Sequence, residues 1–328
     1  MGNINLVLLP ILALIGGSIM LYLGAEGLVR GSSSLALRKG ISSLVVGLTI
    51  VAFGTSSPEF VVSITSALKG NSAIAFGNIV GSNICNIALI LGVAAIITPI
   101  KVNIRLIKSD IIIMIAVTIL LIFLILDKNL GQLDGLILLV GIIWYVFFTL
   151  YTAKKDRKKL DLELPKEVRG RTIKDIFFIV FGVTLLVIGA NLFIDGAIKI
   201  AKFLEVSDVV IGLSVVAVGT SLPELATSIV AAVKKEADIS IGNIVGSNIF
   251  NILGILGIAS LLHPISLTGA NSINIVDIAV MIIVSVILLP LAYTKLTMSR
   301  LEGLFLFFLY IAYIFYMYFY RIQEFSYF

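Results

Sequence analysis

The sequence predicts an all-α polytopic membrane protein with ten transmembrane helices in two inverted five-helix repeats, with broken helices at the membrane midplane. Three observations predict this fold class. First, 59% of the 328 residues are hydrophobic, only 13% are charged, and the mean hydropathy is +1.14. A soluble domain could not bury so much apolar surface, so a lipid bilayer is the expected surrounding. Second, long apolar stretches follow one another along the chain, and third, one half of the sequence repeats the other.

Each apolar stretch of roughly 17 to 25 residues is long enough to cross a bilayer as a helix. The first stretch has no basic flank and no small-residue cleavage site, so we expect a transmembrane helix and not a removed signal peptide. The predicted spans are residues 6–27, 42–68, 72–97, 107–126, 133–153, 173–194, 209–233, 238–262, 275–293 and 302–320.

The distribution of basic residues predicts the topology. Segment 154–172 is rich in Lys and Arg, and the positive-inside rule places such a loop in the cytoplasm. Five spans precede it and five follow, so both termini are expected outside. The chain should therefore be a multi-pass protein of the cell (plasma or inner) membrane. This placement also explains the net charge of +5 without a nucleic-acid partner.

A shift of 165 residues aligns Gly47–Ile100 with Gly212–Ile265 without a gap, and about 30 of these 54 positions are identical. Because each half carries an odd number of spans, the second copy must enter the membrane upside down, which is the inverted-repeat plan of secondary transporters. The expected domains are a first repeat at 1–153 with a hairpin at about 42–97, a cytoplasmic linker at 154–172, and a second repeat at 173–328 with a hairpin at about 209–262.

The motif GTSSPE at 54–59 returns as GTSLPE at 219–224. A carboxylate at membrane depth costs a few kcal/mol, so Glu59 and Glu224 are expected to hold something positive. The proline in each motif should break the helix at the preceding Gly-Thr-Ser and free backbone carbonyls, which are ligands for hard cations. The carbonyls expected to be free are those of Ala52 to Thr55 and of Ala217 to Thr220.

The second helix of each hairpin carries GNIVGSNICN (77–86) and GNIVGSNIFN (242–251). Asparagine and serine recur every four residues, which places them on one face of a helix. These residues are Asn78, Ser82 and Asn86 in the first copy and Asn243, Ser247 and Asn251 in the second. The paired glycines of each G-x-x-x-G are expected to let another helix approach closely. Five acids near span ends are expected to be ordinary solvated or snorkelling charges, namely Glu26, Asp110, Asp195, Asp277 and Glu302.

The paired motifs, in two five-span halves, resemble those of the sodium/calcium exchanger family, within the cation/calcium antiporter superfamily and of prokaryotic type. The resemblance implies an antiporter, and not an enzyme, that exchanges Na⁺ for Ca²⁺ by alternating access. No cofactor and no obligatory protein partner is expected; Ca²⁺ and Na⁺ are the transported ions. The implied metal ligands are the carboxylates of Glu59 and Glu224, oxygens of Thr55, Thr220, Ala52 and Ala217, the serines Ser56, Ser221, Ser82 and Ser247, and Asn86 and Asn251 near the centre.

Two departures from the family narrow this expectation. Several members carry Asp where this chain has Asn251, and in animal relatives that Asp accompanies potassium co-transport, so a potassium requirement is not expected. The linker is too short for the calcium-sensing domains of animal exchangers.

Two other functions remain open: an H⁺/Ca²⁺ (or other divalent cation) antiporter and a passive cation channel. An intramembrane enzyme is disfavoured because no His, Ser or Asp constellation suited to nucleophilic or metal chemistry lies at membrane depth.

Overall fold

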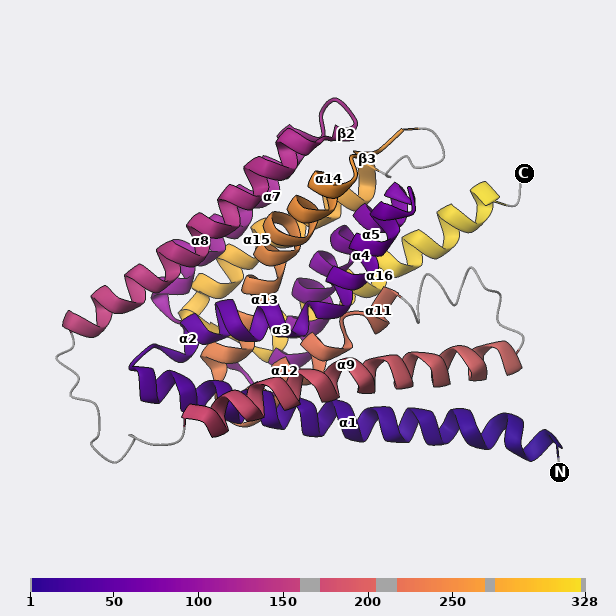
Figure 1. Cartoon of the computed structure of the whole chain (residues 1–328), viewed down its shortest axis with the longest axis horizontal. Helices are drawn as coiled ribbons and strands as arrows, with labels where there is room; N and C mark the ends of the chain where they lie inside the picture. The colour runs from indigo at the N-terminus through magenta and orange to yellow at the C-terminus, as the bar shows by residue number, and fades with distance from the viewer. Residues whose placement is uncertain (1, 160–171, 205–216, 269–274, 326–328) are drawn as a thin grey trace.

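The computed structural model describes residues 2–159, 172–204, 217–268 and 275–325, and within these ranges the fold is almost entirely helical (Figure 1). Eight of the described helices are long and apolar enough to cross a membrane, or up to nine when the bent pair Ser43–Thr55 and Ser57–Leu68 counts as one span. The predicted span 209–233 begins outside the described residues. The predicted linker 154–172 also lies mostly outside them.

The elements of the first half follow the predicted order. They are α1 (Gly2–Lys39), α2 (Ser43–Val46), the π-helical η1 (Gly47–Val51), α3 (Ala52–Thr55), α4 (Ser57–Leu68), α5 (Ser72–Ile84), the π-helical η2 (Cys85–Leu91), α6 (Gly92–Ile97), β1 (Ile100–Lys101), the π-helical η3 (Leu106–Asp110), α7 (Ile111–Leu124), β2 (Asn129–Leu130) and α8 (Gln132–Lys159).

The second half repeats much of this order. Its elements are α9 (Thr172–Phe203), α11 (Ala217–Gly219), α12 (Leu222–Val233), α13 (Ala237–Ile249), the π-helical η6 (Phe250–Leu256), α14 (Gly257–Leu262), β3 (Ile265–Ser266), α15 (Ile275–Tyr293), the 3₁₀ turn η8 (Thr294–Leu296), β4 (Thr297–Met298) and α16 (Arg300–Phe325).

Two helical segments form the centre of the molecule. In Ser72–Ile97 and Ala237–Leu262, 78% of the most apolar window is buried, against 28% in α1 and α9. Glycine permits this packing, because a Cβ at Gly246 would lie 2.6 Å from the carbonyl oxygen of Leu48. The predicted packing role is thus confirmed for Gly242 and Gly246. For Gly77 and Gly81, the residues that correspond to Leu44 and Leu48 lie outside the described ranges.

Helices α1 and α9 lie side by side along one edge of the molecule (Figure 1). Their backbones touch where glycines face each other: a Cβ at Gly182 would stand 2.6 Å from the amide nitrogen of Leu28. Near one end of the pair, Arg38 Nε lies 2.5 Å from Asp175 Oδ2. Both helices extend beyond the predicted ends at 27 and 194. In α1, polar residues beyond residue 27 find partners on neighbouring elements, which allows the helix to continue.

Two short antiparallel strand pairs tie the halves together. Strand β1 pairs with β4, with Ile100 opposite Met298, and β2 pairs with β3, with Leu130 opposite Ile265. All four of these side chains are buried. Strand β1 follows α6 and pairs with the connection between α15 and α16, while β3 follows α14 and pairs with the connection between α7 and α8. Each pair therefore attaches the end of a central helix to two outer helices of the other half.

Candidate functional site

Both proline motifs interrupt a helix at the predicted place. Helix α3 ends at Thr55 and α4 begins at Ser57, and the helix axis bends there by 49°. In the second half α11 ends at Gly219 and α12 begins at Leu222. In both cases the proline occupies the first turn of the new helix, where its missing N–H is not needed. The broken-helix prediction is confirmed at both positions.

The expectation of free carbonyls is wrong for part of the first break. The oxygen of Ala52 still accepts a hydrogen bond from the Ser56 amide at 3.1 Å, and the Gly54 oxygen accepts one from Ser57 Oγ at 2.8 Å. A 49° bend leaves much of the turn closed, so the backbone does not unwind over four residues. Ala52 is fully buried, and its oxygen also accepts hydrogen bonds from Thr55 Oγ1 at 3.3 Å and from Ser247 Oγ at 3.5 Å. The surroundings of Ala217 lie outside the described structure.

The two glutamates are completely buried and are bridged across the halves of the chain. Ser221 Oγ donates to Glu59 Oε1 at 2.9 Å, and Ser56 Oγ donates to Glu224 Oε1, also at 2.9 Å. Ser82 adds a second donor to Glu59 Oε1 at 3.3 Å. Each carboxylate is therefore held by a serine from the other broken helix, so the two motifs meet at one place inside the molecule.

A second layer of polar side chains supports the breaks. Asn78 Nδ2 donates to Ser63 Oγ at 2.9 Å, and in the second half Asn243 Nδ2 donates to Ser228 Oγ at 3.1 Å. The threonines of the motifs donate hydrogen bonds to asparagines of the opposite half. Thr55 Oγ1 donates to Asn243 Oδ1 at 3.0 Å, and Thr220 Oγ1 donates to Asn78 Oδ1 at 3.5 Å. The predicted polar stripes thus converge from both halves.

Four buried oxygens at corresponding positions have no hydrogen-bond partner among the described residues: Glu59 Oε2, Glu224 Oε2, Asn86 Oδ1 and Asn251 Oδ1. Buried polar atoms are almost always hydrogen-bonded, so four unpartnered oxygens at matched positions need an explanation. Hard cations are bound by oxygen ligands, and a bound cation would satisfy all four atoms. In the described residues, no group of three or more His, Cys, Asp or Glu side chains gathers at one place. The candidate site therefore combines two carboxylates with neutral oxygens.

Sequence reasoning missed two groups of buried polar residues. Asn83 and Asn248, each 1% exposed, lie beside the site, and the tripeptide Gly-Ser-Asn shared by both motifs was the available signal. The expectation that Asp110 and Asp277 are solvated is wrong. Asp110 is fully buried with Tyr145 Oη 3.4 Å away, and Asp277, 7% exposed, accepts from Tyr313 Oη at 3.0 Å.

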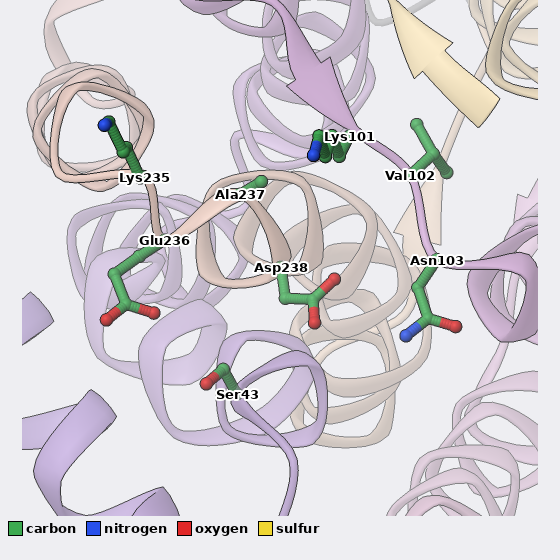
Figure 2. A pocket seen from close by; sticks show the side chains of 8 residues that line it. All are labelled: Ser43, Lys101, Val102, Asn103, Lys235, Glu236, Ala237 and Asp238. Atoms are coloured by element: carbon green, nitrogen blue, oxygen red, sulfur yellow. The ribbon is translucent and has the colours of Figure 1, made fainter. Parts of the chain in front are cut away.

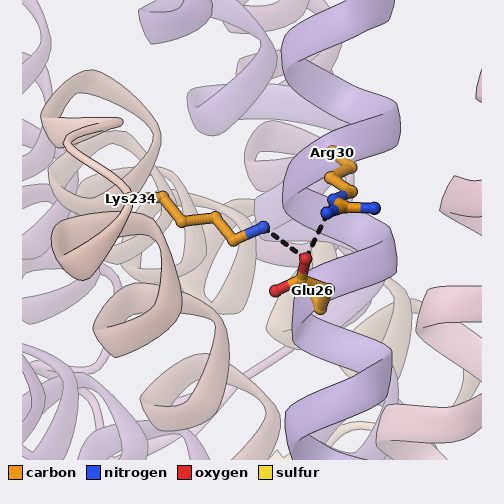
Figure 3. Close-up of polar contacts among 3 residues, drawn as sticks. All are labelled: Glu26, Arg30 and Lys234. Carbon is orange, nitrogen blue, oxygen red and sulfur yellow. Dashed lines mark ion pairs between the residues drawn. The ribbon is translucent and has the colours of Figure 1, made fainter.

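Glu26 is also not an isolated solvated charge. Its Oε1 lies 2.5 Å from Lys234 Nζ and 2.8 Å from Arg30 Nε, so it joins α1 to the end of α12 (Figure 3). Seven residues further along α1, Ser33 Oγ donates to Glu236 Oε1 at 2.7 Å. These contacts connect α1 to the turn between α12 and α13.

A surface hollow of about 320 Å³ lies beside the same turn. Figure 2 shows Glu236 from the turn and Asp238 from the start of α13, together with Lys101 and Asn103 from the segment around β1. Its two carboxylates are offset by lysines, and Glu236 is already bonded to Ser33. None of the residues that line this hollow belongs to the buried carboxylate site, so the two are separate.

Comparison with known proteins identifies the family. The family model described as sodium/calcium exchanger protein matches residues 9–152 and 174–319. The chain belongs to the sodium/calcium exchanger family. Sodium/calcium exchanger MaX1 from Methanosarcina acetivorans is 34% identical to this exchanger over 278 residues, covering 73% of this chain and 79% of the relative. Putative antiporter CaxA from Alkalimonas amylolytica is 35% identical over 241 residues, covering 72% and 75% of the two chains.

Solved structures agree with this assignment. A structure of the sodium-calcium exchanger NCX_Mj soaked with Na⁺ and Sr²⁺ superposes on the exchanger with a TM-score of 0.82 at 34% identity, covering 94% of this chain and 98% of the other. A structure of the same protein soaked with Na⁺ and Ca²⁺ gives a TM-score of 0.80. The exchanger is a multi-pass integral membrane protein and a transporter, not an enzyme, and cation/Ca²⁺ exchange is its activity.

Proposed function

We propose that the exchanger moves Ca²⁺ against Na⁺ by alternating access, with Glu59 and Glu224 as cation ligands shared by both ions. The single observation that carries this proposal is the pair of buried, serine-bridged carboxylates, each with one oxygen that finds no partner within the part of the chain that the structure describes. The names of the relatives support Na⁺ as the counter-ion, since MaX1 and NCX_Mj are both called sodium/calcium exchangers.

The donor set fits the chemistry of Ca²⁺. This ion takes 6 to 8 oxygens at about 2.3–2.6 Å, and two carboxylates would cancel its charge. Na⁺ ions would use the same carboxylates with neighbouring hydroxyls, so the two ions could not occupy the site together. The proposed ligands are Glu59, Glu224, Asn86 and Asn251, the serines Ser56, Ser82, Ser221 and Ser247, the threonines Thr55 and Thr220, and the backbone oxygens of Ala52 and Ala217.

The proposed transport cycle depends on the repeated architecture. In this proposal the chain has ten spans in two inverted repeats, both termini lie outside, and α1 and α9 move against the central hairpins. A site without cargo would carry two uncompensated buried charges, which disfavours movement of the empty carrier. Coupling of the two ion fluxes follows from that penalty.

The proposal is tested by ⁴⁵Ca²⁺ uptake into proteoliposomes loaded with Na⁺, with parallel vesicles loaded with K⁺ or carrying only a proton gradient. We expect ⁴⁵Ca²⁺ uptake only into the Na⁺-loaded vesicles. Uptake driven by the proton gradient alone would instead identify an H⁺/Ca²⁺ antiporter, and flux that is independent of any counter-ion would identify a channel.

The ligand assignment is tested in the same vesicles with Glu59→Gln and Glu224→Gln. Each change removes one of two charges that balance Ca²⁺, so uptake should fall to background. Asp127→Asn, which changes an exposed acid in the loop before β2, is the matched control and should transport normally. Normal uptake by either glutamine variant would refute the shared-carboxylate site.

A further inference from the structure

Asn83 and Asn248 occupy corresponding positions in α5 and α13 and meet at the contact between these helices. Both are 1% exposed. Neither bonds to the glutamates, and neither belongs to the two stripes that form the candidate cation site. Their hydrogen bonds nevertheless lead directly to Asn86 and Asn251, two of the residues with an unpartnered oxygen.

The backbone fixes the direction of both amide side chains. Asn83 Nδ2 donates to the backbone oxygen of Asn248 at 3.3 Å, and Asn248 Nδ2 donates to the backbone oxygen of Asn83, also at 3.3 Å. A backbone carbonyl can only accept, so each side chain must turn its NH₂ group toward the other residue's backbone. The Oδ1 atom of each side chain must then point the other way.

This direction passes on to the next pair of asparagines. The Oδ1 atom of Asn248 accepts from Asn86 Nδ2 at 3.0 Å, and Oδ1 of Asn83 accepts from Asn251 Nδ2 at 2.9 Å. Because an amide oxygen can only accept, Asn86 and Asn251 must use their NH₂ groups here. Their own oxygens therefore face away from the bonded asparagines, and these are the buried oxygens without a partner.

We propose that Asn83 and Asn248 are positioning residues, which do not touch the cation but hold Asn251 and Asn86 with their amide oxygens toward it. This inference rests on the proposed cation site. Rotating either amide by a half turn would exchange an oxygen for an NH₂ group, and a donor proton repels a cation. The two bonds to backbone carbonyls oppose that rotation, so the direction of the ligands is set by the backbone of α5 and α13.

The pairing crosses between the halves, which gives a specific test. Asn83 orients Asn251, and Asn248 orients Asn86. Asn83→Leu should weaken Ca²⁺ binding roughly tenfold, because one hydrogen bond and one ligand direction are lost. In an Asn251→Ala background the same Asn83→Leu change should have no further effect, whereas in an Asn86→Ala background its full effect should remain.

The measurement is the Ca²⁺-dependent rise in the thermal unfolding temperature of the full-length protein in detergent, titrated with Ca²⁺ and separately with Na⁺. The unfolding temperature without added cation reports stability alone, so a purely structural role would lower it without changing the midpoint of the Ca²⁺ titration. Asn83→Asp keeps an acceptor for Asn251 and should retain Ca²⁺ affinity within about threefold.

The positioning role would be overturned if Asn83→Leu weakened Ca²⁺ binding by the same factor in the Asn251→Ala and Asn86→Ala backgrounds. It would also be overturned if Asn83→Leu alone left the midpoint of the Ca²⁺ titration unchanged. If Asn83→Leu does not fold, Asn83→Ala replaces it in the same cycle. Failure of the unmutated protein to respond to either cation would instead refute the proposed cation site, so the two failures are distinguishable.

Discussion

Ser56 and Ser221 each donate a hydrogen bond to the glutamate of the opposite motif at 2.9 Å. These two hydroxyls join each broken helix directly to the carboxylate of the other one. We expect Ser56→Ala and Ser221→Ala to raise the KM for Ca²⁺ about 10- to 100-fold each, since a hydrogen bond to a charged group contributes roughly 1.5–3 kcal/mol. The two effects should be similar, because the two contacts have the same length.

Initial rates of ⁴⁵Ca²⁺ uptake over a range of Ca²⁺ concentrations measure this effect. Thr65→Ala is the control, because Thr65 is an exposed residue of α4 whose hydroxyl bonds only within its own helix. A shift of the KM in the control as large as in the serine variants would show that α4 as a whole, and not the carboxylate contact, is responsible.

The candidate carboxylates were predictable from the sequence, but part of their surroundings was not. Glu59 and Glu224 stand out because a charge within an apolar span has few explanations other than a bound cation. The role of Asn83 depends on which end of an amide faces a backbone carbonyl, and only the three-dimensional contact between α5 and α13 decides that. The Ala52 carbonyl was misjudged because proline predicts a break but not how far the backbone unwinds.

Close contact between α1 and α9 depends on glycine at the crossing. A Cβ at Gly24 would lie 2.8 Å from the backbone oxygen of Gly182, and a backbone atom cannot move aside as a flexible side chain can. Gly24→Ala should therefore lower stability by about 1–3 kcal/mol through overpacking. Gly16→Ala, on the same helix, meets only a leucine methyl at 3.4 Å and should be tolerated.

Thermal unfolding of both variants in detergent, followed by size-exclusion chromatography, measures this difference. Equal unfolding temperatures for the two alanine variants would mean that α1 and α9 do not pack as closely in solution as in the structure. A lower temperature for Gly24→Ala alone is the expected result.

The elements themselves were largely predictable, whereas their ends were not. Pro58 and Pro223 placed both breaks correctly because the ring removes a helical hydrogen bond. The end of α1 was predicted near residue 27, although the helix continues to Lys39. Polar residues beyond residue 27 find partners elsewhere in the fold, as Ser33 does with Glu236, and such long-range pairs leave no trace in local composition.

The pair Glu26 and Lys234 makes a prediction for how α1 is held against α12 (Figure 3). Both side chains are partly exposed, so Lys234→Met should change the free energy of this contact by about 1 kcal/mol or less. We expect up to roughly a fivefold change in the maximal rate of Ca²⁺ uptake, because the balance between conformers shifts, with little change in KM. Lys235→Met is the neighbouring exposed control. A change confined to KM would place the effect of Lys234 in cation binding instead.

Across the whole molecule, the two sequence repeats are not packed alike. Helix α1 packs along α12, whereas among the described residues α9 has no comparable packing on α4. Val230 on α12 is accordingly only 8% exposed, while Thr65, the residue 165 positions earlier on α4, is exposed. The broken helices are similar, so this difference arises from the placement of α1 and α9. We expect this difference to leave one end of the site more covered than the other.

This asymmetry predicts unequal reactivity of two introduced thiols. In a Cys85→Ala background, reconstituted in nanodiscs so that both faces meet the reagent, the Thr65→Cys variant should react with a polar maleimide about tenfold or more faster than the Val230→Cys variant. The tenfold ratio of reaction rates follows because a conformer that uncovers Val230 would be a minor state with a population of roughly 0.1–10%, and only that fraction of the protein could react. An exposed loop position, changed by Lys128→Cys, sets the upper rate. Equal rates at Thr65 and Val230 would mean that the exchanger does not favour this one-sided arrangement, and a reversed order would mean that α9, not α1, covers its hairpin in the resting protein.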